Sequence, residues 1–144
     1  MQISSRFTIA VHVLICIESF KNDYKITSEF LASSVNVNPV VIRRILQQLK
    51  KAGIVEVKRG TGGAVIAKDL KEITLLDVYN AVESVEEGKL FHFHEEPNPE
   101  CPVGRNIHKI LDQRLETIQK AMEEQMRSVS IQDVMEDTNK IILL

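Results

Sequence analysis

The sequence predicts a mainly α-helical fold with a small β-hairpin and a long C-terminal helix. Apolar residues recur every three or four positions over most of the chain, which is the period of a helix. Four of the six glycines lie between Gly53 and Gly63 and indicate a tight turn, and three of the four prolines lie between Pro97 and Pro102 and indicate a non-helical loop. The chain has 144 residues, 44% of them hydrophobic, so one domain, or one domain with an appendage, is expected.

Three helices are predicted before the glycines. Ser4 or Ser5 caps the first and Thr27 or Ser28 the second, while Asn38 caps the third, which begins with a proline. Two apolar stretches, 54–57 and 64–67, then form a hairpin with a basic, glycine-rich tip at 58–63. Two short helices joined by a tight turn and followed by a charged hairpin predict a winged helix-turn-helix.

The C-terminal half predicts one long helix between two short ones. Thr74 and Asp77 form a capping box for a helix that ends near Glu83, and Ser130 with Asp133 caps the last helix. The long helix has about 24 residues and an apolar stripe, which predicts dimerisation because one small domain cannot cover it. The stripe consists of Val103, Ile107, Leu111, Leu115, Ile118, Met122, Met126 and Val129.

These elements predict three parts. Residues 1–89 form the winged helix-turn-helix, residues 90–102 a proline-rich candidate sensing loop, and residues 103–144 the dimerisation helix with the short final helix. The longest apolar run, 9–17, is too short to span a bilayer and ends without a cleavage site, so a cytoplasmic protein is expected. Two cysteines are too few for a disulfide framework, which agrees with a reducing compartment.

The net charge of −2 conceals two unlike halves. Residues 1–68 carry ten Lys and Arg against four Asp and Glu, a net +6, whereas residues 69–144 carry eight against sixteen, a net −8. This distribution predicts that the N-terminal half faces a polyanion.

The third helix supplies the predicted DNA contacts. At 100° per residue its apolar residues Ile42, Ile45, Leu46 and Leu49 share one side, and the other side has four cations and no carboxylate. Arg and Gln suit base edges and Lys suits phosphates, and a wing of this kind lies against phosphates or enters a minor groove. The predicted DNA-binding residues are Asn38, Val40, Arg43, Arg44, Gln47, Lys50, Lys51, Lys58, Arg59, Gly60, Gly62 and Gly63, with Gln48 on the same polar side.

Five segments carry a resemblance to a known family. They are Asn38-Pro39-Val40-Val41-Ile42-Arg43-Arg44, Leu49-Lys50-Lys51-Ala52-Gly53-Ile54-Val55, Arg59-Gly60-Thr61-Gly62-Gly63, Ile73-Thr74-Leu75-Leu76-Asp77-Val78 and Asn98-Pro99-Glu100-Cys101-Pro102-Val103-Gly104. With them the chain resembles the BadM/Rrf-two family of bacterial winged helix-turn-helix regulators, and the last segment is most like that of its YwnA-like members. The resemblance implies a homodimeric repressor with crossed long helices. The wing departs from the commoner pattern at Thr61, Ala64 and Val65.

Many regulators of that family hold an iron–sulfur cluster on three cysteines of the loop, but this chain has only Cys101 there, so no cluster is expected. Cys101 precedes the long helix, whose positive N-terminus would activate a thiolate, so it is the candidate redox sensor. His92 and His94 are weak metal candidates beside it. Cys16 is expected in the core and His12 in the core or an interface.

The sequence therefore predicts a sequence-specific DNA-binding transcriptional regulator, a homodimeric repressor switched by thiol oxidation at Cys101 and acting on an approximately palindromic operator. Two alternatives stay open: a winged-helix protein-interaction module, and a metal-responsive regulator that uses His92, His94 and Cys101. No enzyme is predicted, because no nucleophile is paired with a base in the sequence.

Overall fold

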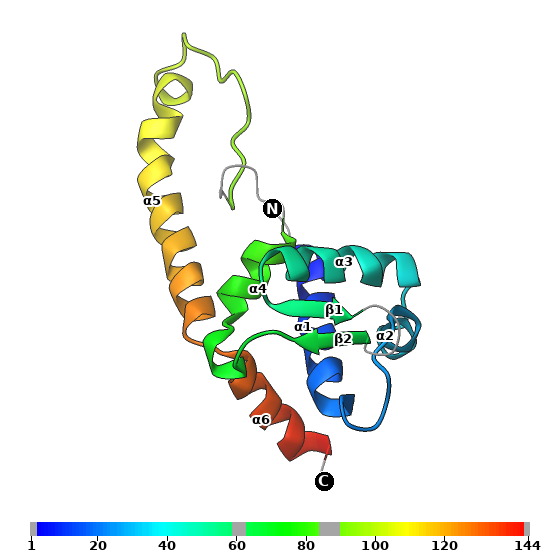
Figure 1. Cartoon of the computed structure of the whole chain (residues 1–144). Helices are drawn as coiled ribbons and strands as arrows, with labels where there is room; N and C mark the ends of the chain where they lie inside the picture. The colour runs from blue at the N-terminus through cyan, green and yellow to red at the C-terminus, as the bar shows by residue number, and fades with distance from the viewer. Residues whose placement is uncertain (1–2, 59–62, 84–89, 143–144) are drawn as a thin grey trace.

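The computed structural model describes residues 3–58, 63–83 and 90–142 (Figure 1). Its elements confirm the predicted class: helices with one two-stranded antiparallel hairpin. In chain order they are α1 (Ser5–Phe20), α2 (Ser28–Val35), α3 (Pro39–Lys51), β1 (Val55–Lys58), β2 (Gly63–Ile66), the 3₁₀ turn η1 (Leu70–Glu72), α4 (Leu75–Val82), α5 (Pro102–Arg127) and α6 (Ile131–Ile142).

The predicted caps begin the helices where the sequence places them. The Ser4 and Thr27 hydroxyls accept from backbone N–H groups of the first turns of α1 and α2. Thr74 and Asp77 form a reciprocal capping box at α4, with bonds of 3.0 and 3.1 Å. Ser130 and Asp133 form the same pair of bonds at α6, at 2.9 and 3.1 Å. Local side-chain hydrogen bonds therefore fix the helix starts.

The first strand begins one residue later than predicted because Ile54 belongs to the end of α3, and the second begins one residue earlier than predicted, at Gly63. Gly53 has a φ of 78°, its N–H donates to the Lys50 carbonyl at 2.9 Å, and the Ile54 N–H donates to the Leu49 carbonyl at 3.0 Å. These two bonds form a Schellman motif, in which glycine takes the left-handed position. Strand β1 then pairs with β2 from Val55 opposite Ile66 to Lys58 opposite Gly63.

One hydrophobic core joins the N-terminal helices, the hairpin and the last helix. Fully buried side chains come from α1, α2, α3, α4 and β1, and Ile131 and Met135 of α6 belong to the same cluster. The Ile131 N–H donates to the Ile73 carbonyl at 2.7 Å, which ties the start of α6 to the start of α4. The predicted part 103–144 is thus not one packing unit, because α6 completes the core of the N-terminal half while α5 does not.

Helix α5 has 26 residues and buries none of them. Figure 1 shows it as a rod that leans away from the rest of the fold, in contact with α4 near its C-terminal end, while the loop before it runs back along its N-terminal half. Within the described ranges, none of the helices is both long enough and apolar enough to cross a membrane.

Candidate nucleic-acid interface

The turn between α2 and α3 sets α3 on the surface. Asn36 ends α2 with a left-handed φ of 63°, and the N–H groups of Asn36 and Val37 both donate to the Ala32 carbonyl, at 2.7 and 3.2 Å. Asn38 then caps α3 through a 2.9 Å bond from the Val40 N–H to its Oδ1. Because hydrogen bonds define every step of the turn, the direction of α3 follows from that of α2.

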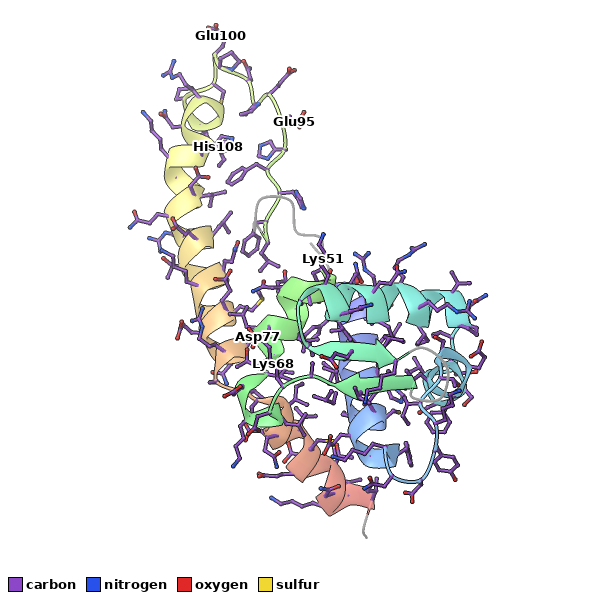
Figure 2. All side chains as sticks on the ribbon, in the orientation of Figure 1. Lys51, Lys68, Asp77, Glu95, Glu100 and His108 are labelled. Atoms are coloured by element: carbon purple, nitrogen blue, oxygen red, sulfur yellow. The ribbon has the colours of Figure 1, made fainter. Side chains whose placement is uncertain are left out.

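Helix α3 buries one side and exposes the other, as the sequence predicts. Ile42, Ile45, Leu46 and Leu49 are buried in the core. We call the opposite side the outward face of α3. Its exposed members are Val40, Arg43, Arg44, Gln47, Lys50 and Lys51. Figure 2 shows Lys51 at the end of α3 that lies nearer α5.

Two polar residues of α3 differ from their predicted roles. The Asn38 side chain is exposed, but its Oδ1 already accepts the capping bond. Only its amide NH₂ takes no part in the cap and can contact DNA. Gln48 is only half-exposed, and its Oε1 is buried without a hydrogen-bond partner in the described part of the chain. Gln48 therefore lies at the edge of the buried side and is not a member of the outward face.

A carboxylate from α2 contacts the outward face. Glu29 Oε1 accepts from Arg43 Nη2 at 2.9 Å, although α3 itself carries no acid. A hydrogen bond from the backbone at Glu29, and then the Arg43 guanidinium, hold the pKa of Glu29 below its ordinary value. Sequence reasoning missed this pair because fourteen residues and a turn separate the partners. The only available signal was that a helix-turn-helix brings the start of its first helix toward its second.

The wing is attached to the segment before α2. Gly63 forms a bridge with Ile26, and a β-carbon at Gly63 would lie 2.4 Å from the Ile26 carbonyl oxygen. The sequence assigns Gly63 to a close approach to DNA, but the contact that requires a glycine here is internal. Lys58 is exposed at the end of β1. The predicted contacts Arg59, Gly60 and Gly62 lie outside the described residues.

Cys101 caps α5 at the end of the predicted sensing loop. Its Sγ accepts from the Gly104 N–H at 3.5 Å, Pro102 is the first helical residue, and the thiol is exposed. A tight turn precedes it, in which the Cys101 N–H donates to the Asn98 carbonyl at 3.2 Å. Its predicted position at the helix N-terminus is confirmed. Figure 2 shows Glu95 and Glu100 on this loop, away from α3.

The two loop histidines do not form a metal site in the described part of the chain. His92 and His94 are exposed, and no three His, Cys, Asp or Glu side chains converge there as ligands would. His108 of α5 is exposed. Its ring lies 4.2 Å from that of Phe93, and its Nδ1 lies 3.4 Å from Asp112 Oδ1.

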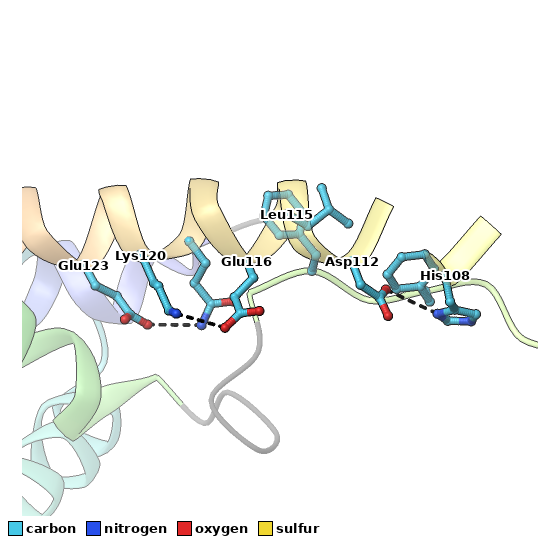
Figure 3. Close-up of a pocket in the computed structure, with 9 residues that line it drawn as sticks. His108, Asp112, Leu115, Glu116, Lys120 and Glu123 are labelled. Atoms are coloured by element: carbon cyan, nitrogen blue, oxygen red, sulfur yellow. Dashed lines mark hydrogen bonds and ion pairs between the residues drawn. The ribbon is translucent and has the colours of Figure 1, made fainter. Parts of the chain in front are cut away.

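A half-open pocket of about 520 Å³ lies between this loop and α5 (Figure 3). Phe91, Phe93 and Leu115 supply its apolar part, and the charged side chains around them come from α5. These charges already have partners: Lys120 Nζ lies 3.0 Å from Glu116 Oε1, and Figure 3 shows this pair beside that of His108 and Asp112. The lining has three carboxylates against one lysine, and the loop is joined to the helix beside it by a 2.8 Å bond from the Leu90 N–H to Gln119 Oε1.

Cys16 is buried, as predicted, and shares a hydrogen-bonding partner with His12. The Ser34 hydroxyl lies 3.2 Å from Cys16 Sγ and 2.9 Å from His12 Nε2. These contacts join α1 to α2 behind the helix-turn-helix. His12 is half-buried and hydrogen-bonded where α1 meets α2, so it lies at a contact between helices and not in the core.

The comparisons with known proteins agree with this geometry. The model of the Rrf2 family, described as an iron-dependent transcriptional regulator, matches residues 3–137. The chain belongs to the Rrf2 family. It is 48% identical over 133 residues to YwnA of Bacillus subtilis (strain 168), a protein assigned as an HTH-type transcriptional regulator, covering 92% of this chain and 96% of that protein. The family and this relative are transcriptional regulators and not enzymes, as the sequence predicts.

Solved structures share the Rrf2 fold. One is a crystal structure of a protein assigned as DNA-binding, 42% identical, with a TM-score of 0.72, which covers 91% of this chain and 99% of that one. A transcriptional regulator from Lactobacillus plantarum, 24% identical with a TM-score of 0.78, covers 94% of this chain and 90% of its own and supports the fold alone. The protein is thus a transcriptional regulator with the winged-helix fold.

The donor atoms of this Rrf2 protein do not fit a cysteine-ligated iron cluster. The chain has two cysteines, and Cys16 is buried between α1 and α2 while Cys101 is exposed at the start of α5. A cluster needs three or four thiolates or substitutes that converge on it. The described loop supplies one thiol and two exposed imidazoles.

Proposed function

We propose that this Rrf2 protein is a homodimeric repressor that binds a specific, approximately palindromic DNA operator in the cytoplasm without an iron–sulfur cluster. The observation that carries the proposal is the outward face of α3, which presents four cations and an amide on a helix that is buried on its other side. A helix of this kind fits a major groove, where its first turns contact base edges. The YwnA relative, assigned as HTH-type, supports the same role.

The residues of this face divide by chemistry. Arg43 and Arg44 carry planar forks that suit guanine, and Gln47 suits adenine, so these three contact bases. Lys50 and Lys51, at the C-terminal end of α3, and Lys58 on β1 contact phosphates. Val40 is exposed in the first turn, where an apolar side chain contacts a thymine methyl group. Arg59, Gly60 and Gly62 stay predicted DNA contacts from the sequence alone.

Dimerisation through α5 accounts for its exposed apolar residues. Val103 is 62% exposed and Ile118 is 53% exposed, and both belong to the predicted stripe. A two-fold dimer buries such a stripe against its own copy. Two symmetric α3 helices then require half-sites about 34–36 Å apart, or a multiple of this distance.

A gel-shift titration tests the DNA-binding proposal. Genomic fragments that the purified protein binds supply the operator, and the salt dependence is measured on it. If the dimer makes roughly 6–10 phosphate contacts, affinity should fall about 10³–10⁵-fold between 50 and 200 mM salt. The double substitution Arg43→Ala, Arg59→Ala should abolish specific binding without unfolding the dimer.

The matched control is Lys109→Ala with Lys140→Ala, which removes two exposed cations from the C-terminal half. It should leave operator affinity unchanged. Unchanged operator affinity of the Arg43, Arg59 variant, or binding that is insensitive to salt, would sink the assignment. A protein-interaction module, the first alternative, would show no salt-dependent affinity for DNA.

We infer that Cys101 switches operator binding through oxidation. The exposed thiol at the N-terminus of α5 supports this role, because an oxidant can reach its sulfur and the Gly104 N–H donates to that sulfur. The Cys101 thiolate attacks hydrogen peroxide and breaks its O–O bond, which gives a sulfenic acid and a hydroxide that takes a proton from solvent. A second Cys101 thiol then condenses with the sulfenic acid to a disulfide across the dimer, releasing water. That bridge changes the spacing of the two α3 helices.

Cys101→Ser tests this switch against Cys16→Ser, the buried control. The Cys101 variant should keep operator binding in peroxide, whereas the wild type and the Cys16 variant should release it. Normal release by Cys101→Ser refutes the switch. Metal analysis of the purified protein separates the remaining alternative, a metal held by His92, His94 and Cys101.

A further inference from the structure

We propose that Glu29 determines the specificity of the DNA contact by positioning Arg43: it holds the Arg43 guanidinium and withholds its charge from phosphates, so that Arg43 contacts a base edge. This inference rests on the proposed DNA-binding function and adds to it a residue from outside the outward face of α3. Glu29 lies in the first turn of α2, the helix that supports α3.

The contact geometry leaves Arg43 free to bind a second partner. A single Nη2 nitrogen of Arg43 meets Glu29 Oε1, at 2.9 Å. An arginine has five N–H donors in a rigid fork, so most of them remain available for guanine O6 and N7. The side chains of Arg43 and Glu29 are 55% and 67% exposed, so DNA can reach the pair. Glu29 thus restricts the rotamers of Arg43 without covering its outer edge.

The pair also separates Arg43 from the other cations of the face. In the described part of the chain, Arg44, Lys50 and Lys51 form no ion pair, whereas Arg43 does. An unpaired cation attracts any phosphate, which raises affinity for every DNA sequence equally. Arg43 with its carboxylate carries no net charge, so a phosphate gains little from it. The acceptors of a base edge are neutral, so their hydrogen bonds to Arg43 depend less on its net charge.

Stability does not account for the pair. Exposed ion pairs contribute little to folding because water screens them and ordering two long side chains costs entropy. The carboxylate nonetheless stays ionised at neutral pH, since its own backbone and Arg43 lower its pKa. An ionised acid that contacts the outward face of α3 lowers the affinity of this face for DNA. The gain that offsets this loss is in selectivity between DNA sequences.

The test compares two duplexes: one selected from genomic fragments by the wild-type protein, and one with the same bases in shuffled order. The variant is Glu29→Gln, which keeps the shape and removes the charge. It should bind the shuffled duplex more tightly, and its slope of log affinity against log salt should steepen by about 1.8 per dimer, one added phosphate in each protomer. The ratio of selected to shuffled affinity should fall roughly fivefold to tenfold, the lower range for one bidentate base contact.

Glu18→Gln is the matched control. Glu18 also pairs with a cation, Lys21, at 2.8 Å, but near the end of α1 that lies away from α3 (Figure 1). This variant loses the same charge from the same half of the chain and should leave both slope and ratio as in the wild type. All variants should have the melting temperature of the wild type. A change in DNA affinity then cannot come from a folding defect.

A double-mutant cycle shows whether Glu29 acts through Arg43. In an Arg43→Ala background, Glu29→Gln should change neither the slope nor the ratio further, because the partner is gone. An effect of full size in that background, or no effect of Glu29→Gln in the wild type, overturns the inference. Failure of the wild type to bind any duplex would instead overturn the proposed function, so the two failures are distinct.

Discussion

Gly63 and Ile26 touch through backbone atoms alone. The Ile26 carbonyl oxygen would lie 2.4 Å from a β-carbon on Gly63, and the same oxygen accepts from the Ala64 N–H at 2.9 Å. This contact joins β2 to the segment that leads into α2, so the wing and the helix-turn-helix are held at one fixed separation. Gly63 also has a left-handed φ of 65°, which residues other than glycine rarely adopt.

Gly63→Ala should therefore weaken both folding and operator binding. We expect the free energy of unfolding to fall by about 2–4 kcal/mol, because a clash with backbone adds to the ~1–2 kcal/mol of the left-handed conformation. Urea unfolding measures it. Gly53→Ala is the control: its φ is 78°, but the nearest atom to its β-carbon would be Lys68 Cε at 3.9 Å. Equal losses for the two variants would show that the Ile26 contact has no energetic importance.

Ile131→Ala should destabilise the N-terminal domain although it lies in α6. Ile131 is fully buried in the core cluster, so its truncation leaves a cavity and should cost ~2–5 kcal/mol. The measurement is urea unfolding, with Ile141→Ala on the exposed side of the same helix as control, expected within ~0.5 kcal/mol of wild type. A wild-type unfolding curve for Ile131→Ala would contradict the shared core.

Ile118→Glu should convert the proposed dimer to a monomer. The substitution places a charge in the stripe that the second copy covers, and a buried unpaired charge costs several kcal/mol. Light scattering after size-exclusion chromatography gives the mass. Gln113→Glu, at an exposed position of α5 outside the stripe, should stay dimeric. A dimeric Ile118→Glu would exclude this face as the interface.

Tyr79 makes the free energy of unfolding depend on pH in the alkaline range. Burial, and then the nearby carboxylates of Glu83 and Glu123, raise the pKa of Tyr79 above its ordinary value of 10.0. The fold therefore favours the neutral phenol, and this contribution is fully present below pH 10.0 and is lost as the pH rises through the raised pKa. Its ring also packs edge-on against Phe7, 6.1 Å away between centroids.

Tyr79→Phe should accordingly lose less stability than the wild type between about pH 9 and pH 11, since phenylalanine keeps the packing and does not titrate. Thermal unfolding at each pH measures the difference. Tyr24→Phe, at an exposed ring, should follow the wild type. A parallel decline of wild type and Tyr79→Phe would remove Tyr79 as the cause.

Local chemistry made most of the fold predictable. Caps such as Thr74 with Asp77, and the proline that follows Asn38, act over three or four residues, and such signals are complete within the sequence. The two sides of α3 follow from the helical period alone. The predicted start of the first strand was wrong by one residue because the Ile54 N–H donates to the Leu49 carbonyl at the end of α3, a bond that the strand pattern does not contain.

Contacts between distant segments could not be predicted in the same way. Glu29 contacts Arg43 only because the turn brings α2 and α3 together. Gly63 must be a glycine because its backbone contacts that of Ile26, thirty-seven positions away by sequence number. The packing of α6 on the N-terminal core was missed for the same reason. Periodicity shows which side of a helix is apolar and does not show which helix covers it.

The position of Ile131 in the core has a consequence for synthesis. A ribosome releases the chain from its N-terminus, so α1, α2, α3 and the wing emerge long before α6. Their shared core stays open until the residues beyond 130 are free, and only then do all its members pack together. A nascent chain therefore exposes this apolar surface until α6 has emerged, although α3 with its outward face emerges long before.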